Sequence, residues 1–145
     1  MKKYLYIIGL SLVAFVDAAY LSWQAYIIRF VENSKVGSFC DLAQNVSCSN
    51  VLQSPYSQIF GISFPWVALC VYPVILILAY FGYKNKNIFQ AKVIQILSFF
   101  GMLFNFYIIY LETFYIFSFC ILCLLCTAII TSIFIISTLL IQQEK

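Results

Sequence analysis

The sequence contains no histidine, and only 9% of its residues are charged. Without histidine, the chain lacks the usual general base, the Ser/His/Asp arrangement, the common zinc sites and histidine-ligated haem. With so few charged side chains, it cannot cover a water-soluble globule with polar surface. Any chemistry must therefore rest on other side chains, and the chain belongs in a lipid bilayer.

Apolar residues, in contrast, make up 64% of the chain. They form runs of about 20 residues, and each run can cross about 30 Å of hydrocarbon as a helix. We predict a single domain over residues 1–145, an all-α integral membrane protein with a bundle of four transmembrane helices. The helices are expected over residues 4–30, 65–83, 93–111 and 117–141, and a polar outward loop over residues 31–64 is expected to cap the membrane between the first two.

The first apolar run also resembles a secretory signal. Lys2 and Lys3 precede it, and the small residues Ala18 and Ala19 mimic a cleavage site. However, its apolar character continues to Phe30, which is too long for a signal core and long enough to span a bilayer with some tilt. We therefore predict that this run is an uncleaved first helix.

The basic residues are distributed unevenly between the two sides of the predicted bundle. One side holds Lys2, Lys3, Lys84, Lys86, Lys92 and Lys145, and the other holds Arg29 and Lys35. The positive-inside rule then places both termini in the cytoplasm and the long loop outside. Because the lysines form short clusters beside apolar runs and no basic face, they indicate membrane topology, and no binding of nucleic acid is expected.

Two pairs among the six cysteines predict thiol–disulfide chemistry at the outer face. Cys120 and Cys123 form a Cys-x-x-Cys motif near the outward start of the fourth helix, where the spacing and the helix N-terminus favour a reactive thiolate. Cys123 is expected about 4.5 Å deeper than Cys120 and facing lipid. Cys40 and Cys48 lie in the outward loop, where they can bond each other or open toward another partner.

An alternative interpretation gives these cysteines no redox turnover. Cys40 and Cys48 would then form a structural staple, and Cys120 and Cys123 would be ordinary small apolar residues of a helix. The chain would be a disulfide-stapled membrane scaffold or a small transporter subunit. The Cys-x-x-Cys spacing argues against this alternative, because a structural helix cysteine does not need it.

Cys126 extends the motif to Cys-x-x-Cys-x-x-Cys, which matches part of an iron–sulfur binding run. The fourth ligand and the following proline are missing, and a continuous apolar helix cannot wrap three thiolates around a cluster. We therefore predict no metal site. Cys126 and Cys70 are interpreted as packing residues within apolar sequence.

Several short motifs occur in a fixed order along nearly the whole chain. They are Cys40-Asp41, Val46-Ser47-Cys48-Ser49, Ser54, Phe60-Gly61-Ile62 and Cys120-Ile121-Leu122-Cys123. In these motifs and their order the chain resembles the vitamin K epoxide reductase family. The resemblance implies a four-helix membrane thiol–disulfide oxidoreductase that reoxidises a thioredoxin-fold partner and passes the electrons to a membrane quinone, either ubiquinone or menaquinone, in support of disulfide bond formation.

The resemblance also implies a location and a partner. Bacterial members would place the chain in the inner membrane, with multiple spans. Some relatives carry a fused thioredoxin-like domain, but none is expected for this protein, so a DsbA-like soluble protein is expected to act in trans. The DsbB family has four helices and two cysteine pairs too, but its Cys-x-x-Cys lies in the first outward loop, and here that order is reversed.

Carried over by position, the resemblance gives each cysteine of the two pairs a role. Cys40 looks like the thiol that exchanges with the partner, and Cys48 looks like the thiol that relays to Cys120. Cys123 looks like the thiol nearest the quinone. Ser54 is similar to a loop serine that supports the reactive site by hydrogen bonding.

Ser57 and Thr127 mark departures from the animal relatives, which carry a quinone-contacting asparagine and a tyrosine there. Both residues are expected near the quinone, and epoxide reduction is not expected. Asp17 lies about 20 Å along the first helix from Tyr4, where an ionisable group is costly. Asp17 either delivers a proton to the reduced quinone or makes one interhelical hydrogen bond as a protonated side chain. The sequence leaves both roles open.

Overall fold

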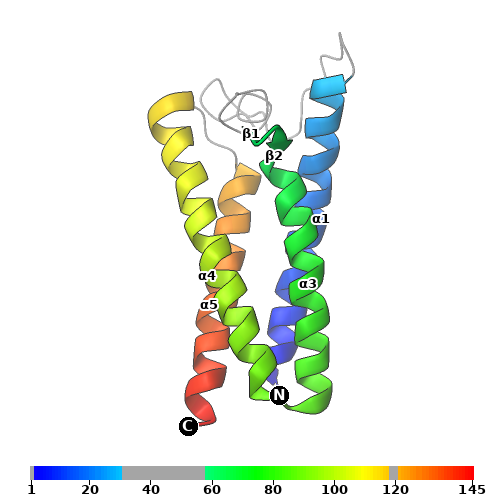
Figure 1. Cartoon of the computed structure of the whole chain (residues 1–145), viewed down its shortest axis with the longest axis vertical. Helices are drawn as coiled ribbons and strands as arrows, with labels where there is room; N and C mark the ends of the chain where they lie inside the picture. Colours follow the sequence, from blue (N-terminus) through cyan, green and yellow to red (C-terminus); the bar gives the residue numbers. More distant parts are fainter. Residues whose placement is uncertain (1, 31–57, 118–120) are drawn as a thin grey trace.

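The computed structural model describes residues 2–30, 58–117 and 121–145. These residues form long helices that run side by side and a short β-hairpin at one end (Figure 1). In chain order the elements are α1 Lys2–Phe30, β1 Gln58–Ile59, β2 Ile62–Ser63, α3 Phe64–Asn85, α4 Ile88–Leu111, the π-helix η2 Glu112–Ile116 and α5 Ile121–Gln143. Both chain ends lie at the end of the bundle opposite the hairpin.

Within the described ranges, four helices are long and apolar enough to cross a membrane. Large apolar side chains such as Leu5, Ile77 and Phe100 are more than half exposed on the outside of the bundle. Exposed apolar surface on this scale is stable in lipid and would not be stable in water. The prediction of an all-α membrane protein with four transmembrane helices is therefore confirmed.

The core forms where α1 packs against α3 and α5, and where α4 packs against α5 and α3. Ala14 and Ala18 of α1 are almost fully buried, and such small residues allow the backbones of neighbouring membrane helices to approach closely. Ile75 of α3 and Ile133 of α5 fill the same cluster. A second buried cluster lies toward the hairpin end and contains Cys123.

The connection between α3 and α4 is shorter than predicted. The predicted start of the third transmembrane helix at residue 93 is wrong, because α4 begins at Ile88. The Asn87 side chain accepts a hydrogen bond of 3.0 Å from the Phe89 backbone N–H and so caps the helix. Lys86 adopts a left-handed conformation with φ 52° and ends α3. Lys92, which was expected to flank the connection, lies inside α4.

The hairpin end of the bundle differs from the prediction in three further ways. The third transmembrane helix does not stop at residue 111, because η2 continues it and Phe117 ends it at φ 56°. Between β1 and β2, Phe60 and Gly61 both carry positive φ, as a tight two-residue hairpin turn requires. The predicted start of the last helix at residue 117 is also wrong, because Phe117 ends η2 and is not part of α5. The structure describes α5 from Ile121.

Candidate active site

Most of the predicted site residues lie outside the described ranges. They are Cys40, Cys48, Ser54, Ser57 and Cys120. Their roles, and the two disulfide pairs, stay predictions. The structure describes the other predicted site residues, namely Cys123, Thr127 and Asp17.

Cys123 lies in the first turn of α5, and its side chain is only 3% exposed. It belongs to the buried cluster near the hairpin end, together with Leu21 of α1 and Phe64 of α3. The expectation that this thiol faces lipid is therefore wrong. Large apolar residues lie on every side of α5, so its apolar pattern alone does not show that Cys123 turns inward.

Cys123 lines a cavity of about 280 Å³ that lies between the helices. Residues of α1, α3, α4 and α5 all contribute to its wall, which is predominantly apolar. Val67 of α3 and Phe100 of α4 line the cavity and are also exposed on the outside of the bundle. The cavity therefore reaches the lipid-facing surface between α3 and α4. Small-molecule pockets usually measure about 300–1,000 Å³, so this one suits a small, flat head group.

Asn105 of α4 is the amide side chain in the wall of this cavity. Its Nδ2 donates a hydrogen bond of 2.8 Å to the Gly101 carbonyl oxygen. An amide group carries two N–H protons, so one donor is left for a ligand. Sequence reasoning missed Asn105, although an amide in the middle of an apolar transmembrane run is itself a signal of a functional site.

Thr127 lies behind the cavity wall, one turn after Cys123. Its hydroxyl group donates a hydrogen bond of 3.0 Å to the Cys123 carbonyl oxygen, and it lies 3.4 Å from Asn105 Oδ1. Thr127 is buried and is not among the residues that line the cavity. It is therefore close to the predicted quinone site and contacts the groups that form the wall.

Asp17 and Cys126 meet inside the bundle. The Cys126 thiol of α5 donates a hydrogen bond of 2.7 Å to Asp17 Oδ2 of α1, and both side chains are less than 10% exposed. The interhelical hydrogen bond considered for Asp17 is therefore present. Cys126 also lines the cavity, so it does more than fill space. Cys70, in contrast, is exposed on α3 and does not pack inside the bundle.

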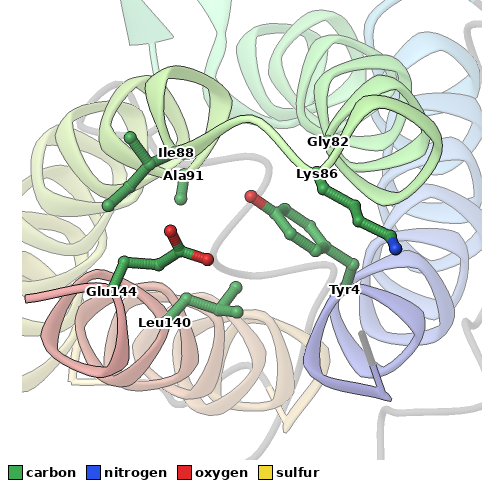
Figure 2. Close-up of a pocket in the computed structure, with 7 residues that line it drawn as sticks. All are labelled: Tyr4, Gly82, Lys86, Ile88, Ala91, Leu140 and Glu144. Carbon is green, nitrogen blue, oxygen red and sulfur yellow. The ribbon is translucent and has the colours of Figure 1, made fainter.

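A second, smaller cavity of about 100 Å³ lies at the end of the bundle that holds the chain termini. In Figure 2 the Glu144 carboxylate and the Tyr4 hydroxyl group point into the space between the helices. This cavity has no cysteine in its wall. It therefore offers nothing to thiol chemistry. In the described part of the chain, no group of side chains is arranged to hold a metal ion.

The comparisons with known proteins agree with this arrangement. The family model described as "Vitamin K epoxide reductase family" matches residues 5–138, which is nearly the whole chain. A search of curated proteins gave no significant match. The matched region includes every residue that lines the larger cavity. The chain belongs to the vitamin K epoxide reductase family of membrane disulfide oxidoreductases.

Proposed function

We propose that the protein oxidises an extracytoplasmic, DsbA-like thioredoxin-fold partner and passes the electrons through two cysteine pairs to a membrane quinone. One observation carries this proposal: Cys123, the second thiol of the Cys-x-x-Cys motif, lines a cavity that reaches the lipid. A membrane quinone is dissolved in that lipid. It can therefore reach the thiol without crossing water.

The wall of the cavity fits a quinone. A quinone head is a flat, largely apolar ring with two carbonyl oxygens, and Phe64 and Phe104 supply apolar aromatic surface beside Cys123. The long tail would leave through the opening marked by Val67 and Phe100. Both ubiquinone and menaquinone heads match this description.

We assign the contact with one quinone carbonyl to Asn105. Its second amide proton can donate to that oxygen, as a polar group in an otherwise apolar pocket usually does to orient a ligand. Thr127 would support this site from behind through its contacts with Cys123 and Asn105. Ser57 lies outside the described residues, and its position near the quinone stays a prediction.

The relay consists of thiol–disulfide exchanges. One thiolate of the reduced partner attacks Cys40 of the Cys40/Cys48 disulfide and forms a mixed disulfide. The partner's second thiol then attacks this bond, so the partner leaves with its own disulfide, and Cys40 and Cys48 are left as thiols. Cys48 then attacks Cys120 and releases Cys123 as a thiolate. Cys40 attacks Cys48 in the resulting Cys48–Cys120 mixed disulfide, which restores the Cys40/Cys48 bond and frees the Cys120 thiol. When the Cys120/Cys123 bond forms again, the two sulfurs lose two electrons, which the quinone accepts together with two protons. Ser54 supports the exchange by hydrogen bonding.

The orientation follows from the positions of the lysines. Lys84 and Lys86 lie at the end of the bundle that also holds Lys2 and Lys145. Under the positive-inside rule, this end faces the cytoplasm and the hairpin end faces outward. We propose the bacterial inner membrane as the location, with both termini in the cytoplasm.

The test uses purified protein with a reduced DsbA-like partner and a short-tailed ubiquinone or menaquinone analogue. We expect thiol oxidation coupled to quinone reduction, and we expect Cys123→Ala and Cys120→Ala to abolish it. Cys70→Ala is the matched control, because Cys70 is exposed on α3 outside the cavity. If the wild-type protein oxidises no thiols with either quinone class, the scaffold interpretation is favoured.

A further inference from the structure

The hydrogen-bonded pair of Asp17 and Cys126 has no part in the electron relay, although it lies beside it. A charged carboxylate in the interior of a membrane is costly unless a cation neutralises it. Asp17 forms no ion pair with any residue that the structure describes, and Lys84 and Lys86 lie at the far end of the bundle. The carboxyl group is therefore suited to hold a proton.

A third side chain completes this group. Tyr72 of α3 is 3% exposed and lies within hydrogen-bonding reach of Cys126 and close to Asp17. Within the described part of the chain, the titratable groups that face Asp17 are thus Cys126 from α5 and Tyr72 from α3. We call these three residues the acid–thiol cluster.

The acid–thiol cluster is next to the site of electron transfer. Cys126 follows Cys123 by three residues, so it lies on a neighbouring position of α5, about 4.5 Å further into the membrane. Cys123, Cys126 and Tyr72 all line the same cavity. A ring in that cavity would contact the thiol that supplies electrons and the thiol that is bonded to an acid.

We propose that the acid–thiol cluster supplies a proton to the quinone as Cys123 supplies electrons, an inference that rests on the proposed function. In the transfer, the Cys126 thiol turns its hydrogen from Asp17 Oδ2 to one quinone oxygen and loses that proton to the quinone. The carboxylic acid of Asp17 then donates its proton to the Cys126 sulfur across their 2.7 Å contact. Tyr72 positions the Cys126 thiol.

The protons and electrons balance over the whole step. The thiols of Cys120 and Cys123 lose two protons and two electrons and form one S–S bond. One of these protons reaches the second quinone oxygen directly, and the other returns to Asp17. The quinone becomes a hydroquinone, and Asp17 and Cys126 end in their starting states.

The experiment compares two oxidants of the reduced, purified protein in single-turnover measurements. A short-tailed ubiquinone needs protons to become hydroquinone, whereas dithiodipyridine reoxidises the thiols by disulfide exchange alone. For Asp17→Asn we expect at least a tenfold slower reaction with the quinone. In this variant solvent protons must replace the missing acid. Because they become scarcer as the pH rises from 6 to 8, the loss of rate should grow over this range. The rate with dithiodipyridine should stay within twofold.

A pair of substitutions at Cys126 tests the relay independently of Asp17. Cys126→Ser keeps a hydroxyl group that can pass a proton and should retain most of the quinone rate, whereas Cys126→Ala should match Asp17→Asn. Ser98→Ala is the control, since Ser98 is fully buried in α4 and does not line the cavity. It should leave both rates unchanged.

Two outcomes would overturn the inference. One is an unchanged quinone rate in Asp17→Asn and Cys126→Ala at every pH. The other is an equal loss with both oxidants, which would mean that the cluster only holds the helices together. Failure of the proposed function is distinguishable, because the wild-type protein itself would then reduce no quinone.

Discussion

Replacement of Asn105 by leucine tests the proposed quinone site at its polar contact. Leucine has nearly the same size and removes the amide that lines the cavity. The substitution leaves few groups without a hydrogen-bond partner, because the Gly101 carbonyl oxygen keeps its backbone hydrogen bond within α4. The Thr127 hydroxyl keeps its 3.0 Å bond to the Cys123 carbonyl oxygen. The change therefore removes one donor to the ligand and little else.

The expected size of the effect follows from a single hydrogen bond between neutral groups. Such a bond contributes about 0.5–1.5 kcal/mol net, and about 1.4 kcal/mol changes an equilibrium constant tenfold. We expect the KM of the Asn105→Leu variant for a short-tailed ubiquinone to rise about 2- to 12-fold. The kcat should change little if the bond is equally strong in the ground state and the transition state.

The assay follows quinone absorbance at several quinone concentrations with saturating reduced partner. Gln95→Leu is the matched control, because Gln95 is an amide on the same helix that bonds Thr138 and does not line the cavity. Its KM for quinone should match that of the wild-type protein. An unchanged KM in Asn105→Leu, or an equal rise in both variants, would refute the assignment of Asn105.

Three other substitutions probe the cavity and the bundle. Ala68 lines the cavity, so Ala68→Phe should occupy part of its space and raise the KM for quinone. Ala128→Phe, on the exposed side of α5, should leave this KM unchanged. Equal KM values in the two variants would contradict the cavity assignment. Gly82→Leu should lower the free energy of unfolding by about 1–3 kcal/mol in denaturant titration, because a Cβ atom there would lie 2.5 Å from Tyr4 Cε1. Unchanged stability would show that the Tyr4 ring moves freely. Thr127→Val should slow quinone reduction less than Asn105→Leu does, and a larger loss in stopped-flow measurements would assign Thr127 the direct contact.

The helices could be predicted from the sequence because about 20 apolar residues are needed to cross the hydrocarbon, and four such runs are present. Their ends were harder to predict. Lys92 suggested a longer connection, whereas Asn87 caps an α4 that begins five residues before the predicted start. The hairpin was missed because Phe60 occupies a positive-φ turn position that sequence rules reserve for glycine or asparagine.

The candidate site was predictable only in part, for a related reason. The Cys-x-x-Cys spacing made Cys123 a candidate, but large apolar residues lie on every side of the helices and do not show which side turns inward. The contact between Asp17 and Cys126 joins residues that are 109 positions apart, so local spacing could not reveal it. The same limit applies to Asn105, which becomes a site residue only because α4 packs beside Cys123.

The spacing of the cysteines along α5 explains why electrons and protons could be handled in one place. Residues three positions apart are neighbours on a helix, and each such step moves about 4.5 Å along its axis. Cys123 and Cys126 use this spacing to reach one cavity at two depths. Under the proposed mechanism, the motif that resembles an incomplete iron–sulfur run has a different explanation: Cys123 would meet the quinone as a redox thiol, and Cys126 would join that quinone to the buried acid of α1.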